Sequence, residues 1–301
     1  MDGSNERAGG RVIRGVRVPG LLYGTAWKEE ATESLVFGAL TTGFRGLDTA
    51  NQRKHYHEAG VGRGLARALQ GGLRRDELFI QTKFTHLAGQ DHRLPYDAAA
   101  PVGEQVAQSF ASSLAHLGVD HLDSLVLHGP SLRDRLAPAD REAWRAMEAI
   151  AEAGGAALIG ISNVTAEQVR ELVGFARIPP AFVQNRCYAQ RGWDRAIRAL
   201  CAEHGIVYQA FSLLTANRDV VAHRAVRAIA ATSSADSVRS SIARSSRMCS
   251  GLVVPVSGSM PTWRANRKIT WATVLPWRWA IARTPRSCST SRLAVSSENA
   301  W

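Results

Sequence analysis

Four polar side chains that can take part in proton transfer lie at or beside the ends of apolar, strand-like runs. Asp48, Lys83 and His128 are each near the end of such a run, and Tyr56 is in the loop that follows Asp48. A Lys ammonium beside a phenol stabilises the phenolate, and an Asp keeps the Lys charged and oriented. The His can position or polarise a carbonyl oxygen. Together these residue types indicate a proton-transfer site with tyrosine as the acid.

Other reaction chemistries have little support in the sequence. The four cysteines, Cys187, Cys201, Cys249 and Cys288, are scattered without a C-x-x-C spacing. This disfavours both a zinc site and a disulfide framework, and no metal is expected. A G-x-S-x-G nucleophile motif is also missing, so hydrolysis is not favoured.

The elements that must position these residues alternate between strands and helices. Helical spacing is clear where Val102, Val106 and Phe110 share one face. Strands that are apolar on both faces, separated by amphipathic helices, predict parallel pairing. Seven such units, with room for an eighth, predict an α/β fold of the (β/α)8 TIM-barrel type in which the eighth unit is in doubt. The absence of G-x-G-x-x-G after the first strand disfavours a Rossmann domain. The strand-like runs are residues 21–27, 46–50, 78–84, 122–128, 157–163, 181–186 and 206–212.

Charge is distributed unevenly along the 301 residues. The net charge is +11, but residues 232–301 hold ten Lys and Arg against two Asp and Glu, and so account for +8. The rest of the chain is only mildly basic, which disfavours nucleic acid as a partner. No apolar run is long enough to span a membrane, and the first residues lack the apolar core of an export signal. We therefore expect a cytoplasmic protein.

Several short motifs, in a fixed order at separate strand ends, resemble the aldo-keto reductase superfamily over roughly residues 12–231. These motifs are Gly24-Thr25-x-Trp27, Asp48-Thr49-Ala50, Tyr56, Lys83 in QTKF, His128 in LHGP, Gly160 to Asn163 in GISN, and the pair Gln184-Asn185. The resemblance implies a barrel that binds NADPH (NADP) across its mouth and reduces an aldehyde or ketone. The family's catalytic tetrad falls on Asp48, Tyr56, Lys83 and His128.

The resemblance also implies which residues contact the cofactor. Ser162 and Asn163, with either Gln184 or Asn185, would hydrogen-bond the nicotinamide carboxamide. The order of Gln184 and Asn185 is inverted relative to the family, which leaves the choice between them open. Phe211 stands where the family usually has a stacking tyrosine, and it keeps the stacking surface. The complete set of expected cofactor contacts is Gly24, Thr25, Trp27, Ser162, Asn163, Gln184, Asn185, Phe211 and Ser212.

The chain departs from the family pattern in two further places. Tyr56 follows Asp48 by eight residues instead of the family's five. After residue 231 the pattern stops, and residues 232–301 contain fifteen Ser and five of the eight Trp. We therefore predict a disordered stretch at 1–11, a reductase-like barrel at 12–231 and an anomalous tail at 232–301. Residues 251–257 are the candidate for an eighth strand, and a frame-shifted reading of the gene is the alternative origin of the tail.

Three functions remain open at this point. The leading one is an NADPH-dependent reductase of small-molecule carbonyls. The second is a cofactor-binding regulatory protein without significant turnover, and the third is the inactive product of a frame-shifted gene. Neither the substrate nor the oligomeric state can be read from the sequence. His55, His57 and His86 are expected to be solvated loop residues.

Overall fold

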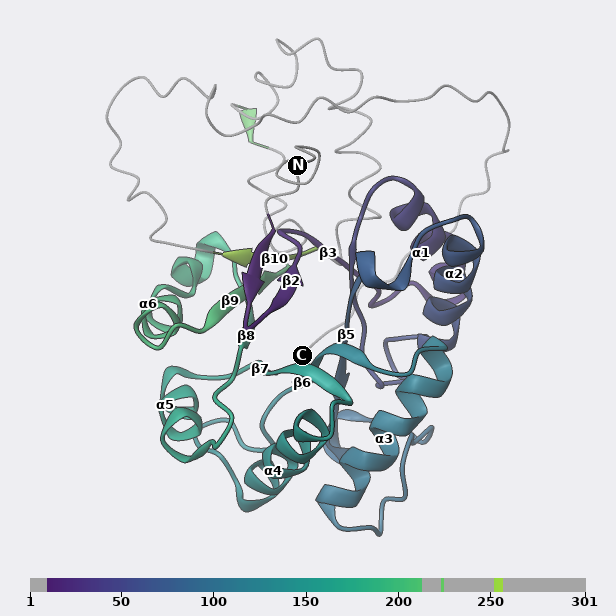
Figure 1. The fold of residues 1–301 in the computed structure, drawn as a ribbon. Helices are drawn as coiled ribbons and strands as arrows, with labels where there is room; N and C mark the ends of the chain where they lie inside the picture. Colours follow the sequence, from purple (N-terminus) through teal and green to yellow (C-terminus); the bar gives the residue numbers. More distant parts are fainter. Residues whose placement is uncertain (1–9, 213–222, 225–251, 257–301) are drawn as a thin grey trace. The chain divides into compact units, whose positions relative to one another are not determined.

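The computed structural model describes residues 10–212, 223–224 and 252–256, all within one compact unit, Met1–Ser259. Strands and helices alternate along this part of the chain (Figure 1). The strands are β1 Arg11–Ile13, β2 Val16–Val18, β3 Leu22–Gly24, β4 Gly46–Asp48, β5 Phe79–Phe84, β6 Leu122–Leu127, β7 Ala156–Ser162, β8 Phe182–Arg186, β9 Val207–Phe211 and β10 Leu252–Val256. The α-helices are α1 Thr32–Thr41, α2 Glu58–Gln70, α3 Val102–Leu117, α4 Pro138–Glu152, α5 Ala166–Phe175 and α6 Arg195–Glu203. Short 3-10 turns are Glu29–Ala31, Arg75–Glu77, Leu87–Gly89 and Ala189–Asp194.

Strands β3 to β9 pair side by side in the order of the sequence, and each pair is parallel. A helix lies between each strand and the next, as parallel neighbours require. The predicted α/β barrel is therefore confirmed. Because all seven strands run the same way, their carboxyl ends meet at one end of the barrel.

The barrel is closed by β10, which pairs with both β3 and β9. Both pairings are antiparallel, so β10 runs against the other strands. An antiparallel strand can enter at the end where β9 finishes and needs no helical crossover. The expected eighth unit therefore differs in direction from the first seven. Most of the tail predicted at 232–301 lies outside the described residues.

A hairpin of β1 and β2 precedes the barrel. Its turn consists of Arg14 and Gly15, which both have positive φ (47° and 83°). This is the geometry of the tight turns that match strand twist. Ile13 and Val16 pack against the first residues of several barrel strands, Leu22 among them. The hairpin therefore lies at the amino ends of the strands, away from their carboxyl ends. Its first strand begins at Arg11, and residues 1–9 lie outside the described part.

Two helices show how the sequence sets local structure. Thr165 accepts a hydrogen bond from the backbone N–H of Gln168 at 3.2 Å, while the Gln168 side chain accepts one from the Thr165 N–H at 2.9 Å. These two bonds form a capping box, and α5 begins directly after it. On α4, Trp144 and Met147 are fully buried. Their spacing of three residues places both side chains on the buried face of α4.

Helices α2 and α3 approach so closely that one position admits no side chain. A Cβ built on Gly62 would lie 2.0 Å from the carbonyl oxygen of His116. We expect Gly62→Ala to lower the free energy of unfolding by about 1–3 kcal/mol, since the backbones must separate. In the matched control Gly38→Ala, on α1, the added methyl meets no atom within 4 Å. That change should raise the free energy of unfolding by up to about 1 kcal/mol. Urea unfolding of both variants measures the difference. Equal free energies of unfolding for the two variants would contradict the close approach of α2 and α3 at Gly62.

Candidate active site

The four predicted catalytic residues come together at the carboxyl ends of three neighbouring strands. Asp48 is the last residue of β4, Lys83 is next to last in β5, and His128 follows β6. Tyr56 lies in the loop between β4 and α2. Because β4, β5 and β6 are paired in this order, their ends are adjacent. This is the end at which barrel enzymes place their active sites.

Lys83 and Asp48 form a buried ion pair. The Lys83 Nζ lies 2.7 Å from Asp48 Oδ1 and also donates a hydrogen bond to the Thr49 carbonyl at 2.8 Å. The two side chains are 2% and 6% exposed. Burial lowers the pKa of Lys83, and the charge of Asp48 opposes that shift. The carboxylate thus both orients the ammonium and helps to keep it charged.

Tyr56 lies over this pair. The Lys83 Nζ is 5.5 Å from the centroid of the Tyr56 ring, within the range of a cation–π contact. Burial raises the pKa of Tyr56, and the negative charge of Asp48 raises it further. The phenol is therefore held in its protonated form. No hydrogen bond joins its hydroxyl to another side chain in the described part of the chain, so the proton is free to be donated.

His128 meets Tyr56 edge to face, with ring centroids 5.8 Å apart. Its Nδ1 lies 2.7 Å from the Thr85 hydroxyl, which fixes the ring orientation and leaves Nε2 for another partner. Burial lowers the pKa of His128 to about 3, and the Lys83 charge contributes to the shift. His128 is therefore neutral near pH 7. The sequence analysis missed Thr85, although it lies only two residues after Lys83.

Because His128 is neutral in the folded protein, we expect the free energy of unfolding to fall in acid. The unfolded chain takes up a proton at this histidine below its ordinary pKa of about 6.5, whereas the folded chain does so near 3. Stability should therefore be lost as pH falls from about 6.5 towards 3, by at most about 1.4 kcal/mol per pH unit. We expect His128→Gln to remove this part of the slope in urea unfolding at pH 7, 6 and 5. The control is His92→Gln in an exposed loop, and an equal slope in both variants would contradict the prediction.

Glu58 fixes the start of α2 two residues after Tyr56. Its buried carboxylate accepts hydrogen bonds from the Thr82 hydroxyl and, at 3.0 Å, from the Ser113 hydroxyl. His116 Nδ1 lies 3.7 Å away. These contacts join the Tyr56 loop to the strand that holds Lys83 and to α3. The sequence offered no signal for them beyond an acidic residue at a helix start.

Several residues that are expected to contact the cofactor make hydrogen bonds to other parts of the protein. Thr25 Oγ1 donates to the Asp48 carbonyl at 3.2 Å, and Ser162 Oγ donates to the Gln184 carbonyl at 2.7 Å. Asn163, which has a positive φ of 55°, donates from Nδ2 to the His128 carbonyl at 2.8 Å. These bonds tie the ends of neighbouring strands together.

The ambiguous pair on β8 points in two directions. Gln184 donates to Asp48 Oδ1 at 3.1 Å, inside the barrel. Asn185 accepts from the Val164 N–H at 3.0 Å and donates to the Val164 carbonyl at 2.8 Å and to Asp194 at 3.1 Å. Asn185 therefore holds the loop after β7, which carries Asn163. The role of either residue towards a cofactor stays a prediction.

The remaining expected contacts lie around the same end of the barrel. Gly24 ends β3, and Phe211 ends β9 and is followed by Ser212. The Phe211 ring lies 5.9 Å from the Arg186 guanidinium carbon. Trp27 is 63% exposed and stacks on His55 at 3.8 Å between centroids. An exposed indole of this kind is available to a ligand.

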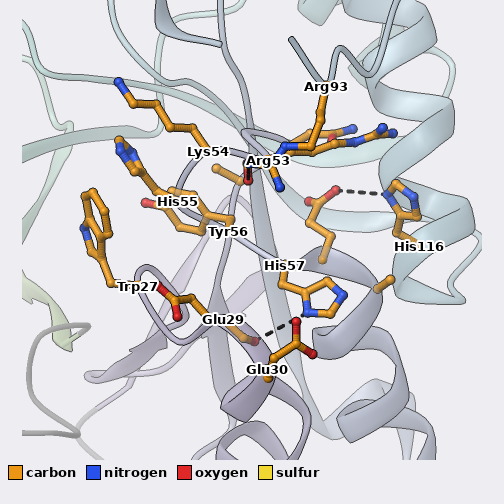
Figure 2. Close-up of a pocket in the computed structure, with 14 residues that line it drawn as sticks. Trp27, Glu29, Glu30, Arg53, Lys54, His55, Tyr56, His57, Arg93 and His116 are labelled. Carbon is orange, nitrogen blue, oxygen red and sulfur yellow. Dashed lines mark hydrogen bonds and ion pairs between the residues drawn. The ribbon is translucent and has the colours of Figure 1, made fainter. Parts of the chain in front are cut away.

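A cavity of about 520 Å³ adjoins Tyr56 (Figure 2). Trp27 and His55 lie on one side of it and His116 on the other. The charged side chains in its lining have both signs: Arg53, Lys54, Arg93, Glu29, Glu30 and Glu58. Such a lining suits a polar ligand. Tyr56 is shared between the tetrad and this cavity.

The expectation that His86 is a solvated loop residue is wrong. Its side chain is 11% exposed, and Nε2 lies 2.9 Å from Asp140 Oδ1. Asp140 also accepts from the backbone N–H groups of Ser131 and Ala137, at the start of α4. His86 therefore links the loop after β5 to the loop before α4. Sequence spacing did not signal this contact because the two residues are far apart in the chain.

The polar groups near His128 offer a free acceptor to the carboxamide of a nicotinamide. An amide ligand needs both an acceptor and a donor, and the Ser162 hydroxyl already donates to the Gln184 carbonyl at 2.7 Å. Asn163 Nδ2 is used within the protein, whereas its Oδ1 accepts no hydrogen bond from the described residues and can accept one from a ligand N–H.

Within the described residues, no group of three or more His, Cys, Asp or Glu side chains is arranged to hold a metal ion. None of the helices in this part combines the length and apolar character that crossing a bilayer requires.

Comparisons with known proteins identify the family of this chain. The model of the Aldo/keto reductase family matches residues 19–218. D-galacturonate reductase of Fragaria ananassa is 33% identical over 205 residues, which cover 63% of this chain and 59% of that protein. Morphine 6-dehydrogenase of Pseudomonas putida is 33% identical over 202 residues, covering 66% and 60%. The chain thus spans about three fifths of the length of these curated relatives.

Solved structures of aldo-keto reductases are also similar to this chain. An aldo-keto reductase of Bombyx mori in complex with NADP has a TM-score of 0.55 and 27% identity, and the match covers 66% of this chain and 64% of that one. The residues that the family model matches, 19–218, contain the strands β3 to β9 and the four clustered residues. The chain belongs to the aldo/keto reductase family.

Proposed function

We propose that this protein is an NADPH-dependent reductase that converts aldehyde or ketone carbonyls into alcohols, with Tyr56 as the general acid. The observation that supports this most directly is the contact of Tyr56 with both Lys83 and His128 above a buried carboxylate. Lys83 Nζ lies 2.7 Å from Asp48 Oδ1 and 5.5 Å from the Tyr56 ring. This arrangement supplies a proton where a carbonyl oxygen gains negative charge.

Each residue has a distinct role in the proposal. A nicotinamide held by these residues would supply a hydride to the carbonyl carbon. Tyr56 donates its proton to the carbonyl oxygen, and Lys83 stabilises the phenolate left behind. His128, being neutral, donates a hydrogen bond from Nε2 to the same oxygen and orients it. Asp48 holds the Lys83 ammonium in place, and Asn163 with Ser162 orients the carboxamide.

NADPH is the proposed form of the cofactor. The Bombyx mori structure contains NADP, and another similar protein is named NADPH-dependent codeinone reductase 1-4, from Papaver somniferum. We also propose a cytoplasmic location, where NADPH is plentiful and where the buried thiols of Cys187 and Cys201 stay reduced. Nucleic acid is not proposed as a partner, since most of the net positive charge, +8 of +11, falls after residue 231.

Titration of the purified full chain with NADPH, followed by quenching of its fluorescence, tests the cofactor. NADH is titrated in parallel, and NADPH consumption with 4-nitrobenzaldehyde is then measured at 340 nm. Saturable binding that prefers NADPH, together with turnover, supports the proposal. Binding without turnover for a panel of aldehydes and ketones would favour the regulatory alternative. A folded protein that binds neither nucleotide would overturn both and favour an inactive product.

A further inference from the structure

Three glutamines on separate strands meet inside the barrel next to Asp48. Gln81 is on β5, Gln184 on β8 and Gln209 on β9, and their side chains are at most 2% exposed. Amide groups buried to this degree are costly unless every donor and acceptor is used. Neither the spacing of the apolar runs nor the family resemblance assigned a role to Gln81 or Gln209.

The hydrogen bonds of the three amides depend on one another. Gln81 Nε2 donates to Asp48 Oδ1 at 2.7 Å and to Gln209 Oε1 at 2.9 Å. Gln184 Nε2 donates to the same two oxygens, at 3.1 and 3.0 Å. Gln209 Nε2 closes the ring by donating to Gln81 Oε1 at 3.2 Å. Each N–H of Gln81 and Gln184 is therefore used, and neither amide can be turned around without losing bonds.

This ring of amides acts on the catalytic ion pair through a single atom. Asp48 Oδ1 accepts from Lys83 Nζ and from two glutamine amides. We propose that Gln81, Gln184 and Gln209 are positioning residues, which hold the Asp48 carboxylate against Lys83 and share its negative charge. The proposal rests on the proposed reductase function, because it assigns these amides to the same reaction site.

The consequence concerns the strength of the ion pair. Hydrogen bonds from neutral donors withdraw charge from a carboxylate, so less of its field reaches Lys83. The other titratable groups that face Lys83 are Glu58 from α2, Tyr56 from the loop before it, and His128 after β6. These groups are untouched by a change in the amides. A change in the pKa of Lys83 caused by a substitution at Gln81 or Gln209 therefore reflects a change in the charge or position of the Asp48 carboxylate.

The test uses Gln81→Met and Gln209→Met, which keep the side-chain length and remove the amide. Gln81→Met should raise the pKa of Lys83, because Asp48 loses a competing donor. Gln209→Met should shift it in the same direction, because Gln81 and Gln184 lose the acceptor that orients their amides towards Asp48, and their hydrogen bonds to its carboxylate weaken. The matched control is Ser124→Ala. Ser124 is the register partner of Gln81 on β6, and its buried hydroxyl has no hydrogen-bond partner among the described residues.

The titration of Lys83 is read by NMR of protein labelled at the lysine ε-carbon. The chain contains four lysines, Lys28, Lys54, Lys83 and Lys268, and Lys83→Met identifies the signal by its loss. In parallel, kcat should fall about tenfold in both Met variants while NADPH binding stays within twofold. An unshifted Lys83 titration in both folded Met variants, equal to that of Ser124→Ala, would overturn the proposal. A shifted titration in a protein without carbonyl turnover would support the positioning role of the amides and overturn the reductase function instead.

Discussion

A Tyr56→Phe variant should lose carbonyl reduction by about 10²- to 10⁴-fold while it binds NADPH as tightly as the wild type. The change removes the hydroxyl and keeps the ring, so the contacts with Lys83 and His128 remain. The packing at this end of the barrel is therefore preserved, while the proton that Tyr56 would donate is removed. Initial rates at 340 nm with saturating NADPH measure the loss, and fluorescence quenching measures the binding.

The matched control removes a hydroxyl elsewhere in the barrel. Tyr208 on β9 donates its hydroxyl to Asp194 at 2.8 Å. Tyr208→Phe should cost about 1 kcal/mol of stability and leave turnover near the wild-type rate. Equal rates for Tyr56→Phe and the wild type would show that Tyr56 is not the proton donor.

Replacing Lys83 with methionine should abolish turnover and also destabilise the fold. The substitution leaves Asp48 buried without its cation, and breaking a buried pair in this way costs about 3–5 kcal/mol. The same change removes the charge that stabilises the Tyr56 phenolate. Urea unfolding measures the first effect, and NADPH consumption at 340 nm measures the second.

Two further variants separate the buried charge from the general loss of a lysine. In the double variant Lys83→Met with Asp48→Asn, no charge is left unpaired, so stability should partly recover while turnover stays lost. Arg74→Met removes the cation of an exposed pair, Arg74 with Asp76 at 2.6 Å, and should cost less than about 1 kcal/mol. A Lys83→Met variant as stable as Arg74→Met would contradict the buried ion pair.

The parts of the fold that follow from local sequence were predictable. Strand and helix alternation depends on apolar spacing, and the capping box at Thr165 depends on residues three apart. The ends of parallel strands then had to bring Asp48, Lys83 and His128 together. A barrel of seven parallel strands could thus be deduced without coordinates.

The contacts that were missed join residues distant in sequence. The amide ring between Gln81 and Gln209 spans 128 positions, and polar residues inside an apolar strand give no sign of their partners. The pairing of His86 with Asp140 depends on how the loop after β5 meets the first turn of α4. The antiparallel direction of β10 escaped prediction as well, since an apolar run of five residues does not specify which way it runs.

The closing strand β10 has a consequence for how this gene can change. Pairing between strands depends mainly on backbone groups, so a barrel's last position can be filled by an unrelated sequence that is apolar and extended. The other seven positions carry the helices and the reacting side chains and have no such freedom. An ancestral terminus could therefore be exchanged for new sequence while the older part of the molecule kept its architecture.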